Sequence, residues 1–189
     1  MRKLTFLFVF IAAAVCLQAQ TLTWDIKFLK GTSQESIPIN QIIRMETGQD
    51  FQIKIFPTSG CFCYVIFYDS KRQIAVLHSG QVSGNKEITI EPIHIDPPSG
   101  TETVYVIMSL TRQTKLEELI LAQKNNPKGR QQANNLYREV VSLQKTASGL
   151  GEPASSFVPC GGTNRQIDLK NATLFSGKNM YVRAITIRH

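Results

Sequence analysis

The sequence is poor in the residues that most often build catalytic and metal sites, with three histidines and four cysteines in 189 residues. It contains no Gly-x-Ser-x-Gly or His-Glu-x-x-His motif and no phosphate-binding glycine loop. After Leu17 it also lacks a second long apolar run, which excludes a further candidate membrane span. These absences leave a cysteine nucleophile as the sharpest enzyme hypothesis and favour a non-enzymatic protein.

The first residues have the layout of a secretory signal peptide. Arg2 and Lys3 precede an apolar run from Leu4 to Leu17, and Ala19 offers a small residue at the cleavage position. Cleavage after Ala19 would lower the formal net charge from +7 to +5, because Arg2 and Lys3 leave with the signal peptide. We therefore expect a signal peptide at residues 1–19 and one domain at residues 20–189, periplasmic or secreted from a bacterium.

The first half of the chain alternates apolar and polar residues between turn signals, which is typical of short antiparallel strands. With 42% hydrophobic residues the chain is too apolar to be disordered. Order is expected to return at Gln166–Leu174 and to end in a last strand of the sheet, Met180–Arg188. The candidate strands of the first half are Leu22–Leu29, Ile37–Arg44, Asp50–Phe56, Cys61–Tyr68, Gln73–His78, Glu87–Ile90 and Thr103–Leu110.

One of these strands, Cys61–Tyr68, is apolar on both faces, so we expect it to be central and covered on both sides. The pattern becomes helical after Leu110. Thr114-Lys115-Leu116-Glu117 has capping-box spacing, and a second apolar stripe ends at Ala147. The sequence therefore predicts a mainly β fold, α+β overall: an antiparallel Ig-like β-sandwich with a two-helix hairpin inserted at about residues 113–147.

Three cysteines remain after signal cleavage, and in an oxidising compartment one disulfide with one free thiol is the simplest arrangement. Cys61 and Cys63 share one face of their strand, so either could pair with Cys160, whereas a bond between the two would be strained. The alternative is that all three are free, buried thiols. Both interpretations stay open at this point.

The segment that starts with the aromatic strand Cys61–Tyr68 resembles a bacterial family of exported domains of unknown function. The resemblance rests on that strand, on Gly80 after the returning strand, and on Pro98-Ser-Gly-Thr-Glu102 before the core strand Val104–Met108. It covers roughly residues 49–121 and departs from the family at Leu77-His78, where relatives often have an aromatic residue and proline. The resemblance implies a β-sandwich module that often accompanies caspase-like or protein-kinase modules, without established catalytic residues.

The enzyme alternative is a cysteine-dependent hydrolase or thiol-redox protein that uses Cys160. Glycines follow Cys160 and could bring backbone N–H groups to a substrate oxyanion, and His78, His94 or His189 could act as the base. Nothing in the spacing selects one histidine; His94 fits a strand and His189 an exposed terminus. We expect no metal, because one residue between Cys61 and Cys63 is too few for a structural zinc site, and no cofactor.

Basic residues cluster on the predicted helical hairpin, at Lys124, Lys128, Arg130, Arg138 and Lys145. Such a face is either simply solvated or meets an anionic partner. We do not expect nucleic acid as the partner, because no aromatic residues alternate with these charges. The hypothesis is an exported interaction module that binds an envelope protein or an anionic envelope component, through the hairpin and the Gly149–Gly162 loop.

Overall fold

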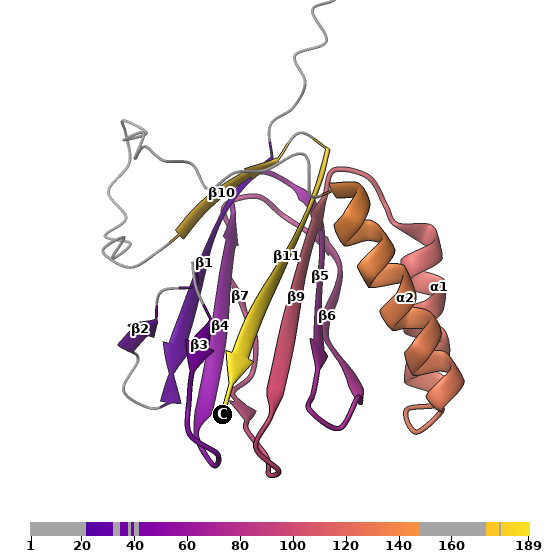
Figure 1. The fold of residues 1–189 in the computed structure, drawn as a ribbon. Coiled ribbons are helices and arrows are strands. Elements are labelled where there is room, and N and C mark those ends of the chain that lie inside the picture. The colour runs from indigo at the N-terminus through magenta and orange to yellow at the C-terminus, as the bar shows by residue number, and fades with distance from the viewer. Residues whose placement is uncertain (1–21, 32–34, 38, 40–41, 148–172, 178) are drawn as a thin grey trace, which may run out of the picture.

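Two β-sheets face each other, and a pair of helices packs on the outer side of one of them (Figure 1). The computed structural model describes residues 22–31, 35–37, 39, 42–147, 173–177 and 179–189. The predicted signal peptide, the Gly149–Gly162 loop and Cys160 lie outside the described residues. The fold is mainly β and sandwich-like with two inserted helices, as the sequence predicts at this level.

The first sheet is centred on two long antiparallel strands, β1 (Leu22–Lys30) and β4 (Asp50–Pro57). Both strands bury every second residue, which is the pattern expected of a sheet with one face on the core. Short strands pair with them on both sides. They are β10 (Thr173–Gly177) and β2 (Glu35–Ile37) beside β1, and β7 (Ile88–Thr89) and β8 (Ile93–His94) beside β4.

The second sheet has the order β3-β11-β9-β5-β6. Its strands pair antiparallel except β3, which lies parallel to β11. Strand β6 is therefore at one edge and β3 at the other. The bounds are β3 (Ile43–Arg44), β11 (Met180–Arg188), β9 (Thr101–Ser109), β5 (Cys61–Tyr68) and β6 (Ile74–Val82).

The helices α1 (Thr114–Asn125) and α2 (Arg130–Ala147) form the predicted hairpin between β9 and β10. Each helix presents an apolar stripe to the outer face of the second sheet. In α1 the buried apolar residues are Leu116 and Ile120, and in α2 they are Leu136, Val140 and Ala147. The second sheet is thus covered on both faces.

Strand β5 contributes to both hydrophobic cores, as its two apolar faces predict. Cys61, Cys63 and Val65 point into the core between the sheets, whereas Tyr64 and Ile66 point into the core under the helices. Burying both faces of a strand removes apolar surface on both sides from water. Each Å² of buried apolar surface stabilises the fold by roughly 25 cal/mol. The strand therefore ties the sandwich and the helices into one packed unit.

Three local expectations were wrong. The described ends of the predicted strand Ile37–Arg44 belong to different sheets: Ile37 ends β2, and Ile43–Arg44 form β3. Pro38, which has no backbone N–H to donate, follows β2 in the sequence. Strand β6 continues beyond His78 to Val82. The capping box is absent: the N-cap residue of α1 makes no side-chain cap hydrogen bond, and Glu117 is instead bonded to Tyr64 and Arg112.

Candidate interaction surface

The five predicted cations are distributed along the helical hairpin. Lys124 reaches from α1 toward β6, where its Nζ donates to Oγ of Ser79 at 3.3 Å. Lys128 and Arg130 lie at the turn between the helices. Arg138 and Lys145 are exposed further along α2. Of the five, Lys128 and Arg130 are the two that line a common cleft.

The turn between the helices forms one wall of a cleft of about 560 Å³, and the turn between β5 and β6 forms the other. We call this the basic cleft. Four of its lining side chains are cationic and none is acidic. The lining residues are Lys71, Arg72, Gln73, Ile74, Pro127, Lys128, Gly129, Arg130, Ala133 and Asn134.

The topology brings the two turns to the same end of the molecule (Figure 1). Strand β9 is antiparallel to β5, so it ends where β5 begins. Helix α1 then runs back along the sheet for 12 residues, about 18 Å at the usual rise. It ends beside the β5–β6 turn, and residues far apart in the sequence meet there.

The cations of the basic cleft are not neutralised by direct ion pairs within the described part of the chain. The carboxylates of the helices that form ion pairs do so with other cations: Glu139 with Lys115 at 2.5 Å and Glu117 with Arg112 at 2.6 Å. Asp69 in the β5–β6 turn accepts the backbone N–H of Gln73 at 2.6 Å and forms no ion pair with a described cation of the cleft. The cleft is therefore a region of positive potential open to solvent.

Backbone hydrogen bonds hold the β5–β6 turn in shape. The N–H of Asp69 donates to the carbonyl of Gln73 at 3.1 Å, and the N–H of Arg72 donates to the carbonyl of Asp69 at 3.0 Å. Arg72 has a φ of 64°, an uncommon conformation for a residue with a side chain. The turn thus presents Lys71 and Arg72 from a closed backbone loop.

A buried glutamine holds the other wall of the basic cleft, the turn between the two helices. Gln123 is only 3% exposed, and its Nε2 donates to the carbonyl of Pro127 at 3.0 Å. The N–H of Gly129 donates to the carbonyl of Asn126 at 2.9 Å, which closes the turn. Helix α2 has no acidic residue in its first turn, so the positive end of its dipole adds to the charge of Lys128 and Arg130.

The start of α1 is bonded to the sheet through Tyr64. Burial raises the pKa of this fully buried tyrosine to about 12, so its hydroxyl is protonated and donates to Glu117. Desolvation alone would raise the pKa of Glu117, but hydrogen bonds from Arg112 and Tyr64 outweigh it and the pKa is lowered. Glu117 is therefore ionised, and the position of α1 over β5 is set by a charge-assisted bond.

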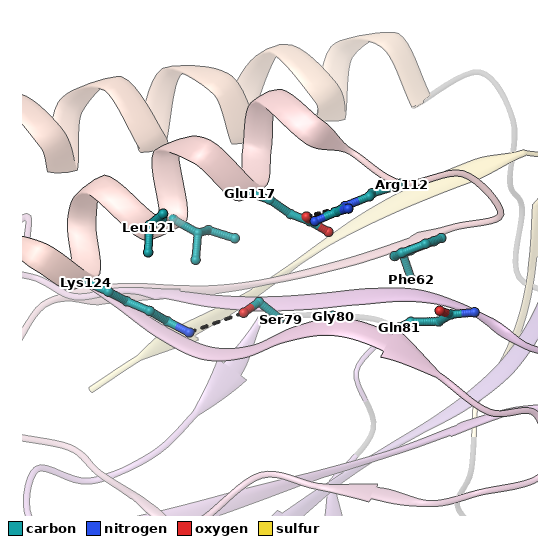
Figure 2. A pocket seen from close by; sticks show the side chains of 9 residues that line it. Phe62, Ser79, Gly80, Gln81, Arg112, Glu117, Leu121 and Lys124 are labelled. Carbon is teal, nitrogen blue, oxygen red and sulfur yellow. Dashed lines mark hydrogen bonds and ion pairs between the residues drawn. The ribbon is translucent and has the colours of Figure 1, made fainter.

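A second depression lies between α1 and β6, and we call it the β6 groove (Figure 2). Its volume is about 480 Å³. Ser79, Gly80 and Gln81 of β6 form one side, and Leu121 and Lys124 of α1 form the other. Leu121 is 60% exposed although it is a large apolar residue. The groove thus combines strand backbone, an apolar side chain and a cation.

The three histidines are in three separate environments. His94 is exposed and bonded to Asp50 at 2.7 Å, in accord with its expected strand position. His78 is half-buried on β6, and desolvation, followed by the charge of Lys124, lowers its pKa. The expectation that His189 is exposed was wrong: its side chain is fully buried, with Nδ1 3.1 Å from Oγ1 of Thr47.

Cys61 and Cys63 are buried, and neither is in a disulfide with another described residue. Burial raises the pKa of Cys61 to about 11 and raises that of Cys63 further. Both thiols therefore lack the lowered pKa of a reactive cysteine. Cys160 lies outside the described residues, so its pairing with Cys61 or Cys63 and its role as a nucleophile stay predictions. Within the described residues, no group of histidine, cysteine and acidic side chains is arranged to hold a metal ion.

Sequence reasoning missed the half of the basic cleft that comes from the sheet. Lys71 and Arg72 are not among the five basic residues that the sequence singles out. The sequence did contain a signal for this half of the cleft. Two adjacent cations lie in a tight turn, and a second basic turn follows downstream. Their meeting with Lys128 and Arg130 depends on the packing of α1 on the sheet.

Comparisons of the chain with protein-family models, with curated proteins and with solved structures find no match. None of the helices in the described part of the chain has the length and apolar character needed to span a membrane.

Proposed function

We propose that this protein is an exported, non-enzymatic binding module that takes an anionic partner into its basic cleft. The observation that carries the proposal is the meeting of Lys71, Arg72, Lys128 and Arg130 at one cleft without an acidic lining residue. Four cations held close together repel one another unless an anion compensates them. An anionic partner would relieve this repulsion on binding.

The proposed location rests on the N-terminal segment, where Arg2 and Lys3 precede the apolar run that ends at Leu17. The resemblance of residues 49–121 to exported accessory domains agrees with a binding role beside other proteins. An Ig-like strand arrangement belongs to the same proposal; its support is that two mainly antiparallel sheets face each other across one core. An experimentally determined structure, compared strand by strand with Ig domains, would test that arrangement.

The binding proposal is tested with polyglutamate, a flexible polymer of carboxylates that probes charge without fixed shape. We expect the mature protein to bind fluorescently labelled polyglutamate, with an affinity that falls steeply as salt is added. Replacing Lys71, Arg72, Lys128 and Arg130 together by alanine should abolish this binding. Fluorescence anisotropy gives the affinity, and circular dichroism shows whether the variant is folded.

A matched control variant removes two cations that do not line the basic cleft. Arg44 lies on β3 at the opposite edge of the second sheet, and Arg138 lies further along α2; both are exposed. The Arg44→Ala, Arg138→Ala double variant should keep most of the affinity. If the cleft variant and the control variant lose equal affinity per charge removed, the protein binds through its net charge and the assignment of the cleft is wrong.

A further inference from the structure

Strand β6 is an edge without a partner strand on its outer side among the described residues. Its nine residues, Ile74–Val82, include no proline and no Lys, Arg, Asp or Glu. Proteins usually protect long edge strands with charges, prolines or a covering segment, because the free backbone groups pair readily with another chain. Among the described residues, the device of this kind within β6 is the register shift opposite Val65 and Ile66, and pairing with β5 is regular on either side of it.

The same strand connects the two depressions of this surface. Ile74 at its start lines the basic cleft, and Ser79, Gly80 and Gln81 near its end line the β6 groove. Nine residues of strand span about 30 Å. A chain that paired with β6 would therefore pass from the basic cleft along the groove in one extended segment.

The groove side of β6 provides contacts for such a segment (Figure 2). Leu121 of α1 is exposed above the groove, where it would cover an apolar side chain of an added strand. Lys124 extends across the groove to Ser79 through an exposed hydrogen bond of 3.3 Å, which an acidic side chain could replace. Arg112 lies at the far end and is 68% exposed, although it is paired with Glu117.

We propose that β6 is a strand-addition site, at which an extended acidic segment of a partner protein pairs with the free edge of β6. Backbone hydrogen bonds supply affinity in this binding mode, and side-chain contacts supply specificity. Acidic side chains of the segment meet the basic cleft and Lys124, and an apolar side chain packs on Leu121. The inference rests on the proposed function, because it names the chemistry of the anionic partner.

A second copy of this chain fits the edge less well. Antiparallel pairing of two β6 strands would bring Lys124 of both copies together near the centre of the pair, since Lys124 lies over Ser79. Each protein also carries a net charge of +7, or +5 after signal cleavage, so two copies repel each other. Charge complementarity thus selects an acidic segment over a second copy.

The experiment uses a synthetic peptide that repeats Glu-Glu-Val-Val, so that each face of the extended peptide carries both acidic and apolar residues. Amide hydrogen exchange, followed by mass spectrometry, should slow in peptides that cover Ile74–Val82 when this peptide binds. It should not change at β3, the opposite edge of the sheet. The affinity should exceed that of polyglutamate at equal charge, because polyglutamate offers no apolar contact to Leu121.

Two controls distinguish the contribution of backbone pairing to peptide binding from the contribution of charge. The same peptide methylated at alternate backbone nitrogens keeps every side chain and loses its ability to pair, so it should bind at least tenfold more weakly. Lys124→Glu should weaken binding of the unmethylated peptide several-fold, whereas Arg44→Glu, the same change of charge at the opposite edge, should leave it nearly unchanged.

The outcomes distinguish the two proposals. If the methylated and unmethylated peptides bind equally and exchange at β6 is unchanged, strand addition is wrong, while binding of polyglutamate at the basic cleft would still support the proposed function. If neither polyglutamate nor the peptide binds, both proposals are wrong. A stable dimer in light scattering, with β6 protected in the protein alone, would assign the edge to a second copy and overturn the inference.

Discussion

The hydroxyl of Tyr64 donates a hydrogen bond to Oε1 of Glu117 at 2.9 Å and accepts one from the backbone N–H of Gln113 at 3.2 Å. Tyr64 belongs to β5, and the other two residues belong to the start of α1. Backbone N–H groups at a helix start have no partner within the helix. A buried side chain of the sheet therefore supplies part of the cap that no side chain of the helix supplies.

Replacing Tyr64 by phenylalanine tests this contact. Tyr64→Phe keeps the ring in the core but removes the hydroxyl bonded to Oε1 of Glu117 and to the N–H of Gln113, so we expect a loss of about 2 kcal/mol in the free energy of unfolding. Urea denaturation measures the loss. The control is Tyr68→Phe, which keeps the ring stacked on Tyr137 at a centroid distance of 4.5 Å. An equally large loss of stability in Tyr68→Phe would mean that the hydrogen bonds of Tyr64 do not account for the effect of Tyr64→Phe.

Glu102 should make stability depend on pH. The side chain is buried, and desolvation, followed by the charges of Asp69 and Asp96 and opposed by that of Lys71, raises its pKa from 4.5 to about 7. The folded state therefore binds a proton that the unfolded state has released, and the stability from this proton is full below pH 4.5 and lost as the pH rises to about 7.

We expect the free energy of unfolding to fall between these pH values and Glu102→Gln to remove this contribution, because the amide does not titrate. Urea denaturation across the range checks the prediction. Oε1 of Glu102 is 3.5 Å from Nε2 of His189, so a His189→Gln variant shows whether the imidazole contributes to the same dependence. An unchanged pH profile in Glu102→Gln would exclude Glu102 as the source.

The two strand cysteines should react slowly in the native protein. Cys61 and Cys63 are buried, and their raised pKa values leave very little thiolate at pH 8. We expect a thiol reagent to modify them much faster in urea than in buffer. Mass mapping of the unreduced protein also tests the predicted disulfide, which would appear as a peptide with Cys160 linked to Cys61 or Cys63. A rapidly modified Cys160 would instead support the nucleophile alternative.

Gln123 should affect both stability and binding. Gln123→Ala removes the buried hydrogen bond to the carbonyl of Pro127, so we expect a loss of about 1–2 kcal/mol in the free energy of unfolding. Because this bond holds the turn that carries Lys128 and Arg130, the affinity for polyglutamate should fall as well. Gln131→Ala, at an exposed position of α2, is the control. Reduced stability with unchanged affinity would show that the cleft does not depend on this anchor.

Much of the fold could be predicted because its signals are local. Strand Cys61–Tyr68 is apolar on both faces, and the structure buries both of its faces. Met180–Arg188 was predicted with its observed bounds. The break within Ile37–Arg44 was missed because apolar character outweighed the effect of Pro38, and the side chain of Glu117 was assigned to a local cap although a sheet residue binds it.

The sequence alone determined most of the strands, both helices and their apolar faces, because periodicity and turn residues act over a few positions. Only the tertiary structure decided that Lys71 and Arg72 meet Lys128 and Arg130, and that β6 is an edge beside them. The scarcity of histidine, cysteine and catalytic motifs could not locate a surface for the proposed binding role. That location comes from the packing of α1 on β5, a contact between residues about fifty positions apart.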